Sequence, residues 1–266
     1  MELATPIVED ILARGKTAVI AGGTGLYVDN LIRGGEFAPT PSTGCRERLE
    51  ERLKNEGFKI GVEIPRGMFG REKQIETALN NVKAVGINDV LCHNIGALYQ
   101  AKALGMTIHG GFGLNLVNTY DLLWAQEYGL KSVELSFELT FERINRLGAT
   151  IDRGIISYSY LPLMLCRNCP NKSGRIDCKT CKNQSKMQDR KGKRFYLKCD
   201  GCCTEVLNCV PLFIADEEIS KLSTSFNVLR FTVENYVENV ENIKDFNGFS
   251  MLKDKFTRGL YKRGVE

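Results

Sequence analysis

The chain has 266 residues, 43% of them hydrophobic and 26% charged, which is ordinary for a soluble protein of one or two globular domains. Its formal net charge of +4 is too small to indicate a nucleic-acid partner by itself. No basic and then apolar segment opens the chain, and no stretch reaches the roughly 18 apolar residues that cross a bilayer. We therefore expect a cytoplasmic protein with no membrane partner, in which thiols stay reduced.

Strands and helices alternate over much of the chain. A short apolar strand at 17–21 runs into a glycine turn, and a charged helix is predicted at 43–55. Further strands are expected at 59–64, 89–92, 106–109, 132–135 and 154–165, with helices at 71–85, 96–104, 119–128 and 140–147 between them. Glycines that are typical of helix C-terminal caps follow these helices, at Gly86, Gly105, Gly129 and Gly148. The alternation predicts βαβ units and a parallel sheet, with too few strands to close an eight-stranded barrel.

After Cys166 this alternation stops. A loop rich in lysine and cysteine is predicted up to about residue 203, then strands at 205–215 and 225–231 and helices at 233–244 and 251–256. The expected fold class is α/β, a partial (β/α) barrel-like parallel sheet followed by a Cys-rich metal-binding segment and a small α+β C-terminal part. The corresponding division of the chain is 1–54, 55–165, 166–209 and 210–266, the last part closing the barrel-like domain.

Eight of the ten cysteines lie between positions 166 and 209, in a run that contains three Cys-x-x-Cys pairs, 166/169, 178/181 and 199/202. In a reducing compartment this clustering indicates metal binding rather than disulfides, because two-residue spacing lets both sulfurs reach one ion. Thiolate softness limits the metal to zinc or an iron–sulfur cluster, and spacing alone leaves both open.

Dispersed motifs between residues 58 and 266 resemble the collagenase-like peptidase family U thirty-two. They are Asn-Ile-Gly at 94–96, the stretch 115–118, Leu-Ser-x-Glu-Leu at 135–139, Leu-Pro-Leu-Met at 161–164, Cys-Pro at 169–170, Asp-Arg-Lys-Gly at 189–192, Glu-Val-Leu-Asn at 205–208, Pro-Leu at 211–212, Thr-Arg-Gly at 257–259 and Arg-Gly-Val-Glu at 263–266. This resemblance implies a TIM-barrel-like α/β fold followed by a cysteine site.

Members of that family are named peptidases, but several are iron–sulfur proteins that hydroxylate RNA bases, with prephenate as a needed small metabolite, or that act in quinone hydroxylation. The resemblance implies a 4Fe-4S cluster, with zinc as the alternative metal. Its ligands would be Cys169, Cys178, Cys181 and Cys199. Cys166, Cys202, Cys203 and Cys209 lie where the resemblance implies no ligand.

Basic residues surround the cysteines, and Phe195 and Tyr196 lie among them. Such a segment can hold the backbone of a tRNA or rRNA and stack a splayed base. The candidate RNA-binding residues are Arg190, Lys191, Lys193 and Arg194. The other interpretation is a solvated loop whose cations offset the negative charge of the thiolates.

Candidate catalytic residues are His109 and Glu138. His93 and His109 are the only histidines, and each ends a predicted strand, which in a barrel points toward the active site. Glu138 is the glutamate of the Leu-Ser-x-Glu-Leu motif and is preferred over Glu134 as the carboxylate of the site. The alternatives are a hydrogen-bonded histidine near the core and a solvated glutamate. Peptidase chemistry has no His-Glu-x-x-His or Gly-x-Ser-x-Gly motif in this sequence to support it.

Near the start, Gly-Gly-Thr-Gly-Leu-Tyr at 22–27 follows a predicted strand, and Gly23, Thr24 and Gly25 are candidate phosphate-binding residues. A purely structural glycine turn is the alternative. The stretch 5–49 resembles tRNA dimethylallyltransferase, whose motif borders the isoprenyl diphosphate and adenosine. The phosphate-binding loop Gly-x-x-x-x-Gly-Lys-[Ser/Thr] of that family is absent, so transferase activity is not expected.

The two resemblances meet between about residues 53 and 58, which indicates a chimeric or truncated chain. We expect an enzyme, an iron–sulfur protein that hydroxylates an RNA base in tRNA or rRNA modification. Three other hypotheses remain. They are a peptidase, a zinc-stapled RNA-binding module without turnover, and a non-functional fusion that does not fold.

Overall fold

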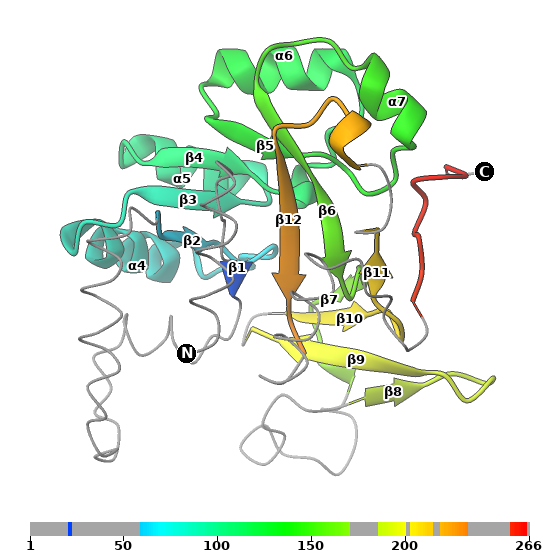
Figure 1. The fold of residues 1–266 in the computed structure, drawn as a ribbon. Coiled ribbons are helices and arrows are strands. Elements are labelled where there is room, and N and C mark those ends of the chain that lie inside the picture. Colours follow the sequence, from blue (N-terminus) through cyan, green and yellow to red (C-terminus); the bar gives the residue numbers. More distant parts are fainter. Residues whose placement is uncertain are drawn as a thin grey trace, which may run out of the picture.

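The structure is a computed structural model that describes residues 21–22, 59–170, 186–200, 203–214, 219–233 and 256–264 (Figure 1). The statements below concern these residues. The turn at 23–25, the helix predicted at 43–55, Cys178 and Cys181 lie outside them. The helices predicted at 233–244 and 251–256 lie almost wholly outside them as well.

Strand–helix units build the first half of the described fold, as the sequence predicts. The strands are β2 (Gly61–Glu63), β3 (Asp89–Cys92), β4 (Thr107–Gly110) and β5 (Ser132–Glu134), and the helices that follow them are α4 (Glu72–Ala84), α5 (Ile95–Ala103), α6 (Thr119–Tyr128) and α7 (Phe141–Arg146). A one-turn 3-10 helix, η1 (Phe112–Leu114), comes after β4.

Polar side chains and glycines set the helix ends. Asn118 begins α6 with a capping box, in which its side chain accepts a hydrogen bond from Asp121 N and the Asp121 carboxylate accepts one from Asn118 N. Gly86, Gly105 and Gly129 have the positive φ predicted for caps. The prediction is wrong at Gly148, because the left-handed residue after α7 is Ala149. Gly148 instead allows a close approach, since a Cβ there would lie 2.9 Å from Thr119.

The main sheet is parallel and curled like a half-barrel, as the expected fold class requires (Figure 1). Its order is β1-β12-β6-β5-β4-β3-β2, where β1 is Ala21–Gly22, β6 is Asp152–Ser159 and β12 is Phe226–Phe231. Every pair along this path is parallel, and β11 (Leu212–Phe213) adds to β6 antiparallel. Parallel pairing places the carboxyl ends of these strands at one edge of the sheet.

The strand nearest the start of the chain contributes to this sheet although it is only two residues long. Ala21 pairs with Arg230 and Gly22 pairs with Phe231, so β1 covers the free edge of β12. β1 also lies next to β2, at the other end of the sheet order. An uncovered sheet edge is a site of unwanted pairing, so this placement protects β12.

The core lies between the sheet and its helices. Val90 and Ile108 are register partners on β3 and β4, both are buried, and Leu98 of α5 and Leu122 of α6 are fully buried in the same cluster. Each buried leucine contributes roughly 1.5–3 kcal/mol through the loss of apolar surface from water. No helix within the described ranges is long and apolar enough to cross a membrane.

A second, smaller sheet is antiparallel and contains Cys166 and Cys199. Its order is β7-β10-β9-β8, with β7 Pro162–Cys166, β8 Lys186–Gln188, β9 Arg194–Cys199 and β10 Thr204–Leu207. The single strand predicted at 154–165 is wrong, because the chain leaves β6 after Ser159 and starts β7 at Pro162. Proline has no N–H for a ladder and therefore suits the first residue of a strand.

The loop predicted from Cys166 to about residue 203 is also wrong in part, since β8 and β9 form a hairpin there. Similarly, the strand predicted at 205–215 is divided into β10 and β11. Val206 and Leu197 pair across β10 and β9, and both are buried. Exposed lysines and arginines elsewhere on the hairpin hide this short apolar pattern in the sequence.

Candidate functional site

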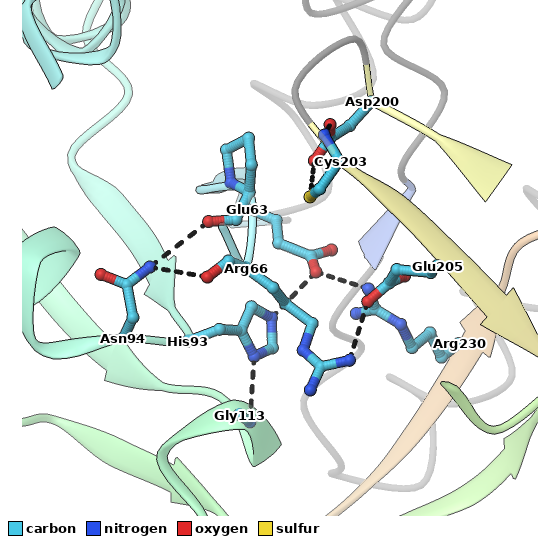
Figure 2. Close-up of polar contacts among 10 residues, drawn as sticks. Glu63, Arg66, His93, Asn94, Gly113, Asp200, Cys203, Glu205 and Arg230 are labelled. Carbon is cyan, nitrogen blue, oxygen red and sulfur yellow. Dashed lines mark hydrogen bonds and ion pairs between the residues drawn. The ribbon is translucent and has the colours of Figure 1, made fainter. Parts of the chain in front are cut away.

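A buried polar cluster lies at the carboxyl edge of the parallel sheet. Glu63 ends β2, His93 follows β3, Glu134 ends β5, and Arg230 is the penultimate residue of β12. Figure 2 shows Glu63, His93 and Arg230 converging, with Arg66 and Glu205 beside them. In open and barrel-like parallel sheets this edge is where ligands bind, because loops and side chains from several strands meet there.

One carboxylate oxygen of Glu63 contacts both Arg230, which lies on β12, and His93, which follows β3. Its Oε1 atom lies 2.6 Å from Arg230 Nη2 and 2.8 Å from His93 Nε2. His93 Nδ1 lies 3.3 Å from the backbone N–H of Gly113, which donates to it. This contact places the imidazole proton on Nε2, so that His93 donates to Glu63.

The Glu63 carboxyl is held ionised. Its burial alone raises the pKa, but the charge of Arg230 and the hydrogen bond from His93 outweigh burial, so the pKa of Glu63 lies far below its ordinary value. In return, Glu63 raises the pKa of Arg230 despite the opposing effect of burial. Glu63 is therefore the fixed negative charge of the cluster.

Glu134 behaves in the opposite way. Its residue is only 4% exposed, and its Oε2 atom accepts a hydrogen bond from Phe112 N at 2.9 Å. Burial raises the pKa of Glu134, although His93, Arg230 and this hydrogen bond lower it in part. Two carboxyls whose surroundings move their pKa values apart are typical of acid–base sites. Glu134 is the carboxyl here that is suited to carry a proton.

A second arginine approaches the cluster from the loop after β2. Arg66 Nη1 lies 2.9 Å from Glu205 Oε1 on β10, so this ion pair joins the half-barrel to the small sheet. The guanidinium carbons of Arg66 and Arg230 lie 4.9 and 5.2 Å from the centroid of the Phe112 ring. His93 packs against the same ring, with centroids 4.7 Å apart. The side chains of Arg66, Arg230 and His93 therefore all pack against the Phe112 ring.

Asn94 explains why the Asn-Ile-Gly motif stands at this position. Its Oδ1 atom caps α5 by accepting from Ala97 N at 2.8 Å, and its Nδ2 atom donates to Arg66 O at 3.1 Å and Pro65 O at 3.4 Å (Figure 2). One side chain thus begins a helix and fixes the loop that carries Arg66.

The two predicted catalytic residues lie elsewhere. His109 Nδ1 is 2.7 Å from Ser132 Oγ and its Nε2 is 2.9 Å from Asp89 Oδ1, so the ring bridges three neighbouring strands. Glu138 is exposed in the turn after β5. In the described part of the chain, the hydrogen-bond partners of the His109 ring are Ser132 and Asp89 rather than members of the Glu63 cluster, and the catalytic roles of His109 and Glu138 stay predictions. Among the described residues, Glu134 is the buried carboxyl that the Leu-Ser-x-Glu-Leu region supplies.

The small sheet aligns two of the cysteines. Cys166 ends β7 and Cys199 ends β9, and both are register partners of Thr204 on the strand between them. Cys169 follows three residues after Cys166, and all three cysteines are half-buried. Within the described ranges no three His, Cys, Asp or Glu side chains form a group that could hold a metal ion. Since Cys178 and Cys181 lie outside those ranges, the predicted ligand set stays a prediction.

The four candidate RNA-binding residues meet on the β8–β9 turn. Arg190, Lys191, Lys193 and Arg194 are all exposed. Asp189 Oδ1 accepts hydrogen bonds from the backbone of Lys191 and Lys193, each at 2.8 Å, and Gly192 takes the positive φ that closes the turn. The turn therefore presents its cations on a fixed backbone.

Sequence reasoning missed Glu63, Arg66 and Arg230. Glu63 and Arg230 fall inside predicted strands whose other residues are mainly apolar or β-branched. A charged residue near the carboxyl end of such a strand is costly to bury unless it is paired. A charged residue at this place in a predicted buried strand therefore indicates a charged partner, and this signal was available in the sequence.

Comparison with known proteins finds similarity at the start of the chain. The IPP transferase family model matches residues 1–64. The tRNA dimethylallyltransferase of Acetivibrio thermocellus is 36% identical over 90 residues, 32% of this chain and 27% of that protein. The enzyme of the same name from an Exiguobacterium species is 42% identical over 159 residues, 58% of this chain and 44% of that protein.

This chain therefore spans less than half the length of the curated relatives it matches. The expected N-terminal resemblance to tRNA prenyltransferases is confirmed, and the matched residues include β1 and Glu63. None of these relatives supports the resemblance to the collagenase-like peptidase family, which stays a prediction.

Proposed function

We propose that this chain acts in RNA modification, with tRNA as its substrate class. The observation that carries this proposal is the basic β8–β9 turn, whose four exposed cations stand on a backbone ordered by Asp189. Cations on a fixed scaffold can contact successive phosphates without a large ordering cost. The matching relatives support the choice of RNA class, because they are named tRNA dimethylallyltransferases.

The acid–base residues of the proposed reaction are Glu134 and His93. Glu134 is buried with a raised pKa, and His93 is held by Glu63 and Gly113. A carboxyl with a raised pKa can exchange a proton near neutral pH, and Glu63 keeps the imidazole in one orientation. Glu134 would then hold or release the proton, while Arg230 stabilises negative charge that develops beside it.

RNA binding is tested by fluorescence anisotropy with tRNA over a range of salt concentrations. The test variant replaces Arg190, Lys191, Lys193 and Arg194 with glutamine. The matched control removes the same charge from exposed positions on other elements, as Lys73→Gln, Lys131→Gln, Arg143→Gln and Arg146→Gln. We expect the first variant alone to bind more weakly, with a salt slope shallower by about 0.7–0.9 per lost phosphate contact. Equal weakening in both variants would refute a role for the turn.

The finer proposal is hydroxylation of an RNA base with an iron–sulfur cluster, which would supply the redox chemistry. Two of the four proposed thiolate donors are among the described residues, Cys199 at the end of β9 and Cys169 three residues after β7, and both are half-buried. Cys169, Cys178, Cys181 and Cys199 would hold the cluster, with zinc as the alternative metal.

Metal content distinguishes these alternatives. Protein purified without oxygen is analysed for iron, acid-labile sulfide and zinc, together with Cys169→Ser, Cys199→Ser and the control Cys209→Ser. We expect iron and sulfide in the parent chain and in the Cys209 variant, and a large loss in the other two. Zinc without iron would contradict the iron–sulfur cluster and would indicate a structural zinc site.

The second candidate function is prenyl transfer to tRNA, favoured by the match over residues 1–64. Nucleoside mass spectrometry of RNA from cells that express the chain separates the two reactions. A nucleoside that gains an oxygen atom supports hydroxylation, and one that gains a dimethylallyl group supports prenyl transfer. RNA unchanged by expression of the chain would contradict both.

A further inference from the structure

Arg230 has hydrogen-bonding capacity that the described part of the chain does not use. The residue is 6% exposed and its Nη2 atom donates to Glu63, but its Nη1 atom is buried and has no hydrogen-bond partner among the described residues. A buried charged donor without an acceptor costs free energy, and such groups are rare in folded proteins. An acceptor that binds from outside the chain would remove this cost.

Arg153 shows that every guanidinium nitrogen of a buried arginine in the same sheet can have a hydrogen-bond partner. Its Nε and Nη2 atoms donate to Ser223, and its Nη1 atom donates to Gly148 O, each at 2.7 Å. Arg153 lies on β6, next to β12 in the sheet. The unused Nη1 of Arg230 is therefore specific to its place at the carboxyl edge of the sheet.

The surroundings of Arg230 supply few acceptors. Glu63 Oε1 already receives both Arg230 Nη2 and His93 Nε2. Glu205 accepts from Arg66, and Glu134 accepts from Phe112 N. Glu134 also raises the pKa of Arg230, but its effect is smaller than that of Glu63.

Access to the cluster is from the side of Arg66. The Arg66 and Glu63 side chains are 24% and 16% exposed, while that of Arg230 is 7% exposed. Arg66 and Arg230 both lie over Phe112, so a ligand that enters beside Arg66 meets two guanidinium groups near one aromatic ring. Guanidinium groups form their strongest hydrogen bonds with carboxylate and phosphate oxygens.

We propose that Arg230 and Arg66 bind the carboxylate or phosphate group of a small molecule at the carboxyl edge of the half-barrel. Arg230 Nη1 donates to one oxygen of this group, and Arg66 faces it from the solvent side. This small-molecule site goes beyond the RNA modification proposed above and stands on contacts that do not involve the basic turn. Its calorimetric test with benzoate, phosphate and benzamide contains no RNA, so the two proposals can fail separately.

The test is calorimetric titration of the whole chain with benzoate, with inorganic phosphate and with benzamide, a neutral analogue of benzoate. All titrations use the same ionic strength. We expect saturable binding of at least one of the two anions and none of benzamide. Benzamide binding as well as benzoate would show that a neutral acceptor suffices and would overturn the proposal.

Variants locate the site. Arg66→Gln removes a partly exposed arginine and should leave the fold intact, whereas Arg230→Gln removes a buried one. We expect each to weaken anion binding at least about tenfold, which corresponds to the loss of one charge-assisted hydrogen bond. Arg146→Gln, an exposed control on α7, should bind as the parent does. If Arg230→Gln does not fold, the Arg66 variant decides the question alone.

Two further outcomes would overturn the proposal. One is the absence of saturable anion binding to the parent chain, which would leave water as the partner of Arg230. The other is anion binding that Arg66→Gln and Arg146→Gln weaken equally. A separate titration with a short RNA identifies the source of the anion. If RNA binds and Arg66→Gln weakens this binding, while neither benzoate nor phosphate binds, the anion is an RNA phosphate and the small-molecule proposal is wrong.

Discussion

The Nη2 atom of Arg230 lies 2.6 Å from the Oε1 atom of Glu63, although the two residues are 167 positions apart in the chain. Glu63 belongs to the segment that the IPP transferase family model matches, and Arg230 lies far beyond it. The β1 strand, also from the matched segment, pairs with the strand that carries Arg230. The described residues of the matched segment therefore belong to the same sheet and the same polar cluster as Arg230.

Glu63→Gln tests how far the cluster stabilises the fold. The change leaves the buried Arg230 guanidinium without its counter-charge, so we expect a loss of about 3–5 kcal/mol in the free energy of unfolding. Glu142→Gln breaks an exposed ion pair with Arg146 and should cost at most about 0.5 kcal/mol. Urea unfolding followed by circular dichroism measures both. Similar losses in the two variants would show that the buried pair contributes no more than a surface pair.

Glu134→Gln should make the chain more stable at neutral pH than its parent. Because burial raises the pKa of Glu134, its protonated form favours the folded state, and this contribution is lost as pH rises above the unfolded value of about 4.3. Glutamine resembles the protonated carboxyl and still accepts from Phe112 N. Unfolding curves over a pH series should show a gain that grows with pH and vanishes in acid. Exposed Glu138→Gln is the control, and a pH-independent gain in the Glu134 variant would contradict the argument.

His109→Ala and Glu138→Ala examine the residues predicted to be catalytic. His109 bridges Ser132 and Asp89, so its loss should reduce the free energy of unfolding by about 1–3 kcal/mol. Glu138 is exposed, and its loss should change that free energy by no more than about 0.5 kcal/mol. Nucleoside analysis of RNA from cells with each variant then separates structure from catalysis. A Glu138 variant that is stable but inactive would restore Glu138 as the catalytic carboxyl.

Cys92 should resist alkylation in the folded chain. Burial raises the pKa of the Cys92 thiol to about 12, so at about pH 8 its thiolate fraction falls roughly 10³-fold below that of an ordinary cysteine. Half-buried Cys169 and Cys209 provide the comparison. Iodoacetamide labelling of metal-free protein, followed by peptide mass spectrometry, should modify Cys92 last, and only urea should equalise the rates. Early labelling of Cys92 would mean that the core opens around β3.

Local patterns in the chain were enough to predict most of the half-barrel. Apolar periodicity and the residues at helix ends depend on neighbours a few positions away, which is why α6 begins and ends where the spacing predicts. The same logic gathered Arg190, Lys191, Lys193 and Arg194 on one turn, because they are adjacent in the chain. Local patterns did not predict β8 and β9, because the few apolar residues there pack against residues of a neighbouring strand and form no apolar periodicity within one strand.

Only the tertiary structure decided which charged residues share the site. Glu63, Glu134 and Arg230 come from strands that are far apart in sequence, and parallel pairing brings their carboxyl ends to one edge. The pKa of Glu63 is lowered and that of Glu134 is raised. These opposite shifts arise from burial and from charged neighbours in space, neither of which can be read from sequence spacing. Glu138 fits a sequence motif better, yet it stays in solvent, because it lies in the turn after β5, whereas Glu134 ends β5 and is buried.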